Sequence, residues 1–147
     1  MHLTSFTDYT LRLLLMAYEA NGELITIEDA ATRFKVSHAH LSKVANRLTQ
    51  SGILTAVRGR SGGLRLERSA ARIRIGDIVR LAEPSFTLVE CFDPKGECQL
   101  AEICKLPPVL HRALVAFMSV LDGVTLAEMA LTQHSSRSLL KRTRHAR

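Results

Sequence analysis

The stretch from residue 26 to residue 66, TIEDAATRFKVSHAHLSKVANRLTQSGILTAVRGRSGGLRL, decides the fold. Its first part predicts a short amphipathic helix over residues 27–34, capped by Thr26, because apolar residues recur there at helical spacing. After a tight link, Ser37 caps a second helix that runs to about Ser51. A short helix, a turn and a further helix are the parts of a helix-turn-helix motif.

The polar side of this second helix has the chemistry of a DNA-reading surface. Small and polar side chains lie at its N-terminal end, where a recognition helix meets base edges. The candidate DNA-contacting residues are Ser37, His38, His40, Lys43 and Arg47. Lysine and arginine at these positions can reach phosphates or guanine. The alternative reading of the same pattern is an ordinary helical hairpin with a solvated face.

A β-hairpin is predicted directly after this helix. Residues 53–57 and 64–67 have strand-like patterns, and the glycine-rich turn between them carries two arginines. A hairpin in this place is the wing of a winged helix, with Arg58, Arg60, Ser61 and Gly62 as candidate DNA contacts. Glycines allow close approach to a phosphate, and arginines suit a narrow minor groove. A flexible surface hairpin is the alternative.

The distribution of charge supports DNA binding more than the formal net charge of +6 does. Residues 33–80 hold eleven basic and two acidic side chains, whereas residues 1–32 and 81–136 each carry a net charge of −4. One basic block between acidic segments is the pattern of a polyanion-binding surface. The last eleven residues, 137–147, add five basic side chains, and we expect a mobile arm there.

Composition excludes several other classes of protein. The chain has 147 residues, which suits one domain or one domain with an appended arm, and its 46% hydrophobic residues are too many for a disordered chain. Aromatic residues make up 5% and tryptophan is absent, which argues against a stacking platform for single-stranded nucleic acid. Neither a membrane span nor a signal peptide is recognisable. We therefore expect a cytoplasmic protein without a membrane partner.

Three further helices are expected around the winged helix. The first covers residues 4–20, with Ser5 as a possible cap and Asp8 three residues later, and it is apolar on most sides. Another lies within residues 73–84, and a clearly amphipathic helix follows Pro108 and runs to about Asp122. In so small a chain, the apolar faces of the first and last helices predict a homodimer interface.

Three cysteines, Cys91, Cys98 and Cys104, lie within fourteen residues of a loop that shows little periodicity. Their odd number argues against a disulfide framework, and their polar surroundings favour metal ligation or redox chemistry over burial. Both a structural zinc site and an iron–sulfur cluster need four ligands, so another group must complete the site. The fourth ligand could come from another part of the chain, from another subunit, or from Glu90, Asp93, Glu97, Glu102 or His111.

The sequence resembles the NsrR repressors, the nitric-oxide-sensing members of a winged-helix iron–sulfur regulator superfamily. The resemblance rests on residues 3–9 (LTSFTDY), 57–63 (VRGRSGG) and 73–79 (IRIGDIV), together with the three-cysteine loop. It covers roughly residues 1–132 and leaves out only the basic tail.

This resemblance implies a homodimer with one iron–sulfur cluster per subunit, [4Fe-4S] or alternatively [2Fe-2S]. The implied ligands are Cys91, Cys98 and Cys104, completed by Asp8 of the partner subunit. Asp8 as a first-turn acid that suits the helix dipole is the competing explanation. The cluster-biogenesis regulator of the superfamily uses a histidine three residues after its last cysteine as a ligand. This chain has Pro107 at that position, which argues against the cluster-biogenesis regulator.

The sequence thus predicts a mainly α fold with a small β-hairpin. The expected parts are a winged helix-turn-helix domain (1–82), a cluster-binding loop (83–107), a dimerisation helix region (108–132) and a basic flexible tail (133–147). The implied function is repression of nitric oxide detoxification genes, with release of palindromic operator DNA when nitric oxide attacks the cluster.

Two alternatives of the regulator class stay open, and an enzyme is a third class to weigh. The protein could be an iron- or redox-responsive regulator of the same superfamily, or a zinc- or thiol-based regulator without iron. An enzyme is not expected, because His38 and His40 lack the HExxH context and no nucleophile elbow or phosphate-binding glycine loop is present.

Overall fold

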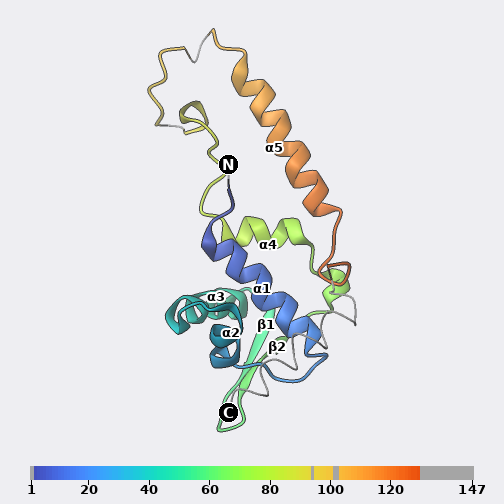
Figure 1. Ribbon diagram of the computed structural model, residues 1–147. Helices are drawn as coiled ribbons and strands as arrows, with labels where there is room; N and C mark the ends of the chain where they lie inside the picture. Colours follow the sequence, from blue (N-terminus) through green and yellow to red (C-terminus); the bar gives the residue numbers. More distant parts are fainter. Residues whose placement is uncertain (1, 94, 101–102, 130–147) are drawn as a thin grey trace.

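The computed structural model describes residues 2–93, 95–100 and 103–129 (Figure 1). The predicted basic tail, the end of the dimerisation region and the ligand candidate Glu102 lie outside these residues. The described elements are α1 (Ser5–Glu19), α2 (Ile27–Phe34), α3 (His38–Gln50), β1 (Leu54–Val57), β2 (Gly63–Leu66), the 3-10 helix η1 (Ala70–Arg72), α4 (Ile75–Ala82), the 3-10 helix η2 (Glu90–Phe92) and α5 (Leu106–Asp122). They confirm a mainly α fold with one β-hairpin.

The helix-turn-helix forms where its capping residues predict it. Thr26 Oγ1 accepts a hydrogen bond from the backbone N–H of Asp29 at 3.0 Å, which satisfies an otherwise free donor in the first turn of α2. Lys35 ends this helix in the left-handed region, with φ of 55°. Because the left-handed residue turns the chain sharply, α3 begins only three residues later and packs against α2.

Strands β1 and β2 form an antiparallel pair in which Leu54 lies opposite Leu66 and Val57 lies opposite Gly63. Leu64 also pairs with Ile25, which leads into α2, through hydrogen bonds of 2.9 and 2.8 Å. This third segment holds the base of the hairpin on the core, while its tip extends away from the helices (Figure 1). The hairpin therefore has the attachment and direction of a wing.

The hydrophobic core lies between α1, α3, α4 and the inner side of the hairpin. Leu13 and Leu14 of α1 and Leu41 and Leu48 of α3 have no exposed surface, and Ile78 of α4 is 1% exposed. Helix α1 packs against both α3 and α4, so it is the central element of the fold. Its central position explains why its sequence is apolar on more than one side.

Helix α1 covers nearly the predicted residues, but its cap lies one residue before the candidate Ser5. The cap is Thr4 rather than Ser5: the Oγ1 atom of Thr4 accepts a hydrogen bond from the N–H of Thr7 at 3.3 Å. Thr4 has the extended backbone of an N-cap residue, with ψ of 156°, whereas Ser5 is already helical. The prediction of Ser5 as the possible cap was therefore wrong by one residue.

Helix α5 also begins earlier than expected, at Leu106 instead of after Pro108. The first turn of a helix tolerates proline because its N–H groups have no intrahelical partner there, so the two prolines start the helix rather than precede it. The start of α5 lies at the end of the molecule opposite the wing, and from there the helix runs back toward α4 (Figure 1). Leu106, Val109 and Val120 are 49–69% exposed.

The chain returns to the core after α5. Leu126 is fully buried, and its N–H donates to the carbonyl of Ile73 at 2.8 Å. Thr125 starts the expected further turn, since Glu128 accepts hydrogen bonds from its N–H and its hydroxyl, both at 2.7 Å. Within the described part of the chain, no helix is long and apolar enough to cross a membrane.

Candidate nucleic-acid interface and cysteine loop

The N-terminus of α3 presents the side chains that were expected to contact DNA. Ser37 Oγ accepts a hydrogen bond from the N–H of His40 at 3.3 Å and lies 3.0 Å from its Nδ1 atom. The His38 Nδ1 atom is 3.2 Å from the hydroxyl of Ser42. Ser37, His38, His40 and Lys43 are all exposed. These contacts preorder the two imidazole rings on the outer face of the helix.

Two contacts tie this helix to its neighbours. The Tyr9 ring of α1 lies 6.4 Å from the His40 ring, centroid to centroid, at an interplanar angle of 36°. Arg47 donates a long hydrogen bond of 3.5 Å to the carbonyl of Leu81 at the end of α4. Arg47 is exposed, and its bond to Leu81 is weak. Reaching a phosphate would therefore cost Arg47 little.

The wing carries its arginines at the tip. Arg58, Arg60 and Ser61 are exposed, and Gly59 has φ of 119°, a conformation that favours glycine. The N–H of Gly62 donates to the carbonyl of Gly59 at 2.9 Å, which closes the turn. A Cβ atom at Gly62 would overlap the carbonyl oxygen of Val57, so the turn needs glycine at this position.

The basic block of residues 33–80 does not face one surface as a whole. Arg33 pairs with Glu19 at 3.1 Å, and both side chains are largely buried, at 16% and 8% exposed. Arg80 pairs with Asp122 at 2.6 Å, and Arg74 donates to the backbone carbonyl of that aspartate at 2.7 Å. Arg74 and Arg80 are themselves exposed, but they are bound to Asp122 at the junction of α4 and α5. Segment charge alone could not separate these three arginines from those of the recognition helix and the wing.

The cysteine loop, residues 83–107, places its three cysteines outside the hydrophobic core. Cys91 lies in η2, Cys98 in an irregular segment and Cys104 just before α5, and all three are half-buried free cysteines. His111 is exposed, and its ring packs edge-on against Phe92 at 6.5 Å, which identifies it as a surface histidine. Glu90 and Asp93 accept backbone hydrogen bonds within the loop, from Glu97 at 3.4 Å and from Lys95 at 2.9 Å.

Asp8 lies in the first turn of α1, where it pairs with Arg12. The two side chains meet at 2.7 and 2.9 Å and are 45% and 47% exposed, respectively. An exposed pair at this spacing contributes little to stability. The Asp8 carboxylate therefore faces solvent and can be reached by a second molecule.

Across residues 2–93, 95–100 and 103–129, no three histidine, cysteine or acidic side chains gather closely enough to hold a metal ion. The donor set nevertheless fits an iron–sulfur cluster in its chemistry. Iron–sulfur clusters are held mainly by cysteine thiolates, and this loop has three free cysteines. Asp8 adds an accessible carboxylate.

Glu83, which the sequence pattern did not single out, connects α1 to the cysteine loop. Its Oε1 atom accepts hydrogen bonds from the Thr4 N–H at 2.7 Å, the Thr4 hydroxyl at 3.1 Å and the Thr7 hydroxyl at 2.5 Å. Partial burial acts to raise the pKa of Glu83, but the hydrogen bonds from Thr7 and Thr4 outweigh it and lower the pKa. No local pattern links residues nearly eighty positions apart, so only the fold reveals this contact.

A capped recognition helix, a basic hairpin wing and a core that presents both on the surface define a winged helix-turn-helix DNA-binding protein. The model of the Rrf2 family, described as iron-dependent transcriptional regulators, matches residues 3–132. The chain belongs to the Rrf2 family. This membership confirms the predicted class, a DNA-binding transcriptional repressor.

Individual relatives agree with the resemblance found in the sequence. The HTH-type transcriptional regulator NsrR of Geobacillus kaustophilus is 45% identical over 146 residues, covering 98% of this chain and 99% of that protein. The regulator of the same name from Bacillus subtilis is 43% identical over 143 residues, covering 96% and 98%. The resemblance to the NsrR repressors is thereby confirmed.

Solved structures share the fold. Staphylococcus aureus CymR in its oxidized form aligns with a TM-score of 0.72 and 26% identity, covering 88% of this chain and 96% of that chain. T. potens IscR aligns with a TM-score of 0.70 over 88% and 85%, respectively; its 24% identity shows the fold alone. These matches confirm the winged-helix architecture that the sequence predicts.

Proposed function

We propose that the protein is a homodimeric repressor that holds an iron–sulfur cluster and releases palindromic operator DNA in response to nitric oxide. One observation carries the proposal: an exposed basic recognition helix and wing share a chain with a loop of three free, half-buried thiols. In the proposed division, residues 1–82 bind DNA, residues 83–107 hold the cluster and residues 108–132 form the dimer contact.

DNA binding would use two surfaces of each subunit. Ser37, His38, His40, Lys43 and Arg47 face the major groove, and Arg58, Arg60, Ser61 and Gly62 approach the neighbouring minor groove or backbone. A twofold dimer presents two such units to half-sites about one helical turn apart. The operator is therefore expected to be an inverted repeat.

The exposed face of α5 supports the dimer. Leu106, Val109 and Val120 lie on one side of α5 by helical spacing and are 49–69% exposed along a helix that leaves the core. Large apolar residues exposed on one side of a helix are typical of an interaction site. A second copy of the same helix would bury it in a self-complementary contact.

The residues that would hold the cluster are Cys91, Cys98 and Cys104, completed by Asp8 of the partner subunit. When bound, the cluster would supply iron, the centre with which nitric oxide reacts. A carboxylate is a harder ligand than a thiolate and binds iron less tightly, so Asp8 is the replaceable member of the set. Arg12, which contacts Asp8 within α1, offers a competing partner once the carboxylate is free.

The consequence for DNA binding follows from the position of Asp8 in α1. This helix packs against α3 and α4, and Tyr9, the next residue, contacts His40 of the recognition helix. When Asp8 is bound at the partner's cysteine loop, α1 is held to the partner subunit. When the carboxylate is released, the separation between the two recognition helices is no longer fixed. Because both half-sites must be bound together for high affinity, this loosening weakens operator binding.

The test is to purify the protein without oxygen, measure iron, zinc and visible absorbance, and titrate it with nitric oxide during a DNA-binding assay. We expect bound iron, a visible band that nitric oxide bleaches, and a parallel loss of DNA affinity. Cys98→Ser should remove the iron and the response. A colourless protein that binds DNA and contains zinc or no metal would refute the proposal in favour of a zinc- or thiol-based regulator.

The role of Asp8 needs a separate comparison, because a first-turn acid also stabilises the helix. Asp8→Asn keeps the shape and a neutral acceptor, so α1 should stay folded while iron retention falls. Arg12→Gln removes the same ion pair from the other side and serves as the matched control. If both variants retain iron and respond to nitric oxide alike, Asp8 is not a ligand.

The description of the family as iron-dependent favours one second candidate, a regulator that senses iron supply or redox state. The same assay separates the two signals. Loss of DNA binding on treatment with an iron chelator or with air, but not with nitric oxide, would assign the protein to this second function.

A further inference from the structure

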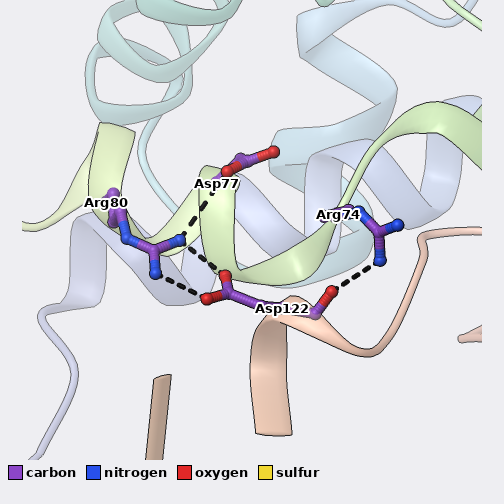
Figure 2. A network of polar contacts seen from close by, with 4 residues as sticks. All are labelled: Arg74, Asp77, Arg80 and Asp122. Carbon is purple, nitrogen blue, oxygen red and sulfur yellow. Dashed lines mark hydrogen bonds and ion pairs between the residues drawn. The ribbon is translucent and has the colours of Figure 1, made fainter. Parts of the chain in front are cut away.

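The end of α5 is joined to α4 by a network of polar contacts (Figure 2). The guanidinium of Arg80, on α4, donates two hydrogen bonds of 2.6 Å to the two carboxylate oxygens of Asp122, the last residue of α5. Arg74, just before α4, donates to the backbone carbonyl of Asp122 at 2.7 Å. Paired arginine–carboxylate bonds have a fixed planar geometry, so this contact orients the two helices as well as attracting them.

Gly76 allows the carboxylate to lie directly on α4. A Cβ atom at this position would overlap Oδ1 of Asp122, so any larger residue must displace the aspartate side chain. Gly76 is buried and helical, and its φ is not positive. Because glycine is a poor helix residue, its presence here is explained by the close approach of Asp122 rather than by the backbone of α4.

The backbone after α5 strengthens the same junction. The N–H of Ile75 donates to the carbonyl of Val124 at 2.9 Å, and Arg74 and Thr125 form an isolated antiparallel bridge. Leu126 then anchors the segment in the core, since it has no exposed surface. The C-terminal end of α5 is thus attached to the start of α4 by main chain, side chains and core packing together.

Helix α4 in turn contacts the DNA-binding elements. Its buried residues Ile78 and Val79 belong to the same core cluster as α1 and α3, and its last turn accepts the hydrogen bond from Arg47 of the recognition helix. The orientation of α5 relative to α3 is therefore set through α4. The opposite end of α5, which adjoins the cysteine loop, has no comparable set of contacts among the described residues.

We propose that Arg80, Asp122 and Gly76 form a specificity-determining joint that sets the distance between operator half-sites accepted by the dimer. This inference rests on the proposed homodimer, in which α5 meets its partner. When the Arg80–Asp122 contact over Gly76 is formed, α5 and the winged helix move as one body. The two recognition helices of the dimer then keep one separation. When this contact is broken, the winged helices can tilt about the end of α5 and bind half-sites at other spacings.

The geometry of DNA makes half-site spacing a sensitive measure of this rigidity. One inserted base pair moves a half-site by about 3.4 Å and rotates it by roughly 35° about the helix axis. A rigid dimer can then bind only one of the two half-sites. Bivalent binding raises affinity by on the order of 10²–10⁴-fold, and the rigid dimer loses this gain. A dimer with a loosened joint recovers part of that factor.

The experiment compares variants of the full-length, anaerobically purified protein on synthetic DNA. The preferred inverted repeat is first selected from random duplexes with the native protein. Affinity is then measured for that duplex, for versions with one or two base pairs inserted or removed at the centre, and for a single half-site. Failure to select any inverted repeat would refute the proposed dimeric repressor itself, not the joint.

Three variants open the joint in different ways. Asp122→Asn weakens the charged bonds, Asp122→Ala removes them, and Gly76→Ala displaces the carboxylate while improving the helix propensity of α4. Asp77→Asn is the matched control, since Asp77 is on the same helix, is 71% exposed and lies 3.6 Å from Arg80. Thermal unfolding of each variant confirms that it folds.

The native protein should bind the preferred spacing at least about 100-fold more tightly than the one-base-pair insertion. In Asp122→Ala and Gly76→Ala this preference should fall to about tenfold, with single half-site affinity unchanged. Asp77→Asn should behave like the native protein. The proposal is overturned if both variants keep the native spacing preference, or if they lose single half-site affinity and spacing preference in the same proportion.

Discussion

Substitution of Glu83 by glutamine is a direct test of how the start of α1 is held. One carboxylate oxygen of Glu83 accepts three hydrogen bonds, from the N–H and hydroxyl of Thr4 and from the hydroxyl of Thr7, at 2.5–3.1 Å. Glutamine keeps the shape and one neutral acceptor oxygen. The variant therefore removes the charge of the acceptor without creating a cavity.

The expected loss follows from the difference between charged and neutral hydrogen bonds. A bond to a charged group contributes about 1.5–3 kcal/mol and a neutral one about 0.5–1.5 kcal/mol, so each donor loses on the order of 1 kcal/mol. The three donors share one oxygen and are not independent. We therefore expect Glu83→Gln to lower the free energy of unfolding at neutral pH by about 1–2 kcal/mol in total.

The pH dependence has a definite sign. Burial opposes the shift, but the hydrogen bonds of Thr7 and Thr4 hold the pKa of Glu83 below its ordinary value in the folded protein. A lowered carboxyl pKa adds stability above the unfolded-state pKa of about 4.3, and this stability is lost as the pH falls through the folded-state value. The difference between native protein and variant should be largest above about pH 5 and shrink toward more acidic pH.

Urea unfolding followed by circular dichroism, repeated from neutral to acidic pH, measures this difference. Glu67→Gln at an exposed position is the matched control and should change the free energy of unfolding little at any pH. The reasoning is refuted if Glu83→Gln is as stable as the native protein at neutral pH. It is also refuted if the destabilisation stays constant down to a pH at which carboxylates are protonated.

Three further predictions concern the DNA surface and the core. Lys43→Ala should weaken binding to all DNA sequences and reduce the slope of log affinity against log salt by about 0.9, the value for one phosphate contact, and an unchanged slope would contradict that assignment. Gly62→Ala, whose methyl would overlap the Val57 carbonyl, should lower DNA affinity while the helical circular dichroism signal stays native; unaltered affinity would show that the wing turn makes no contact. Leu48→Ala, at a fully buried position of α3, should lower the free energy of unfolding by about 2–5 kcal/mol in urea titration, and a loss below that range would mean that the core closes over the cavity.

The local elements of this fold were predictable because their signals lie close together in the chain. The caps Thr26 and Ser37 and the glycine-rich turn act over a few residues, so the helix-turn-helix and the wing could be placed from the sequence. The errors were equally local. Thr4 rather than Ser5 caps α1, and α5 starts before its two prolines, because neighbouring residues offered nearly equivalent starting points.

The assignment of basic residues was predictable only in part. Lys43, Arg58 and Arg60 are exposed as expected, whereas Arg33 and Arg80 form ion pairs with Glu19 and Asp122, carboxylates of other helices. A count of charges along the chain treats all arginines alike. Whether an arginine faces solvent or an aspartate from another helix depends on the packing of elements far apart in the sequence.

The sequence by itself determined the class of protein and its chemical inventory, namely a helix-turn-helix with a basic wing, three clustered cysteines and an amphipathic last helix. Short-range capping, helical periodicity and residue type are sufficient for these features. Only the tertiary structure decided how they are connected, through Glu83 at the start of α1 and through Asp122 on Gly76 at the end of α5. These contacts join residues more than forty positions apart, so they exist only once the core has brought their helices together.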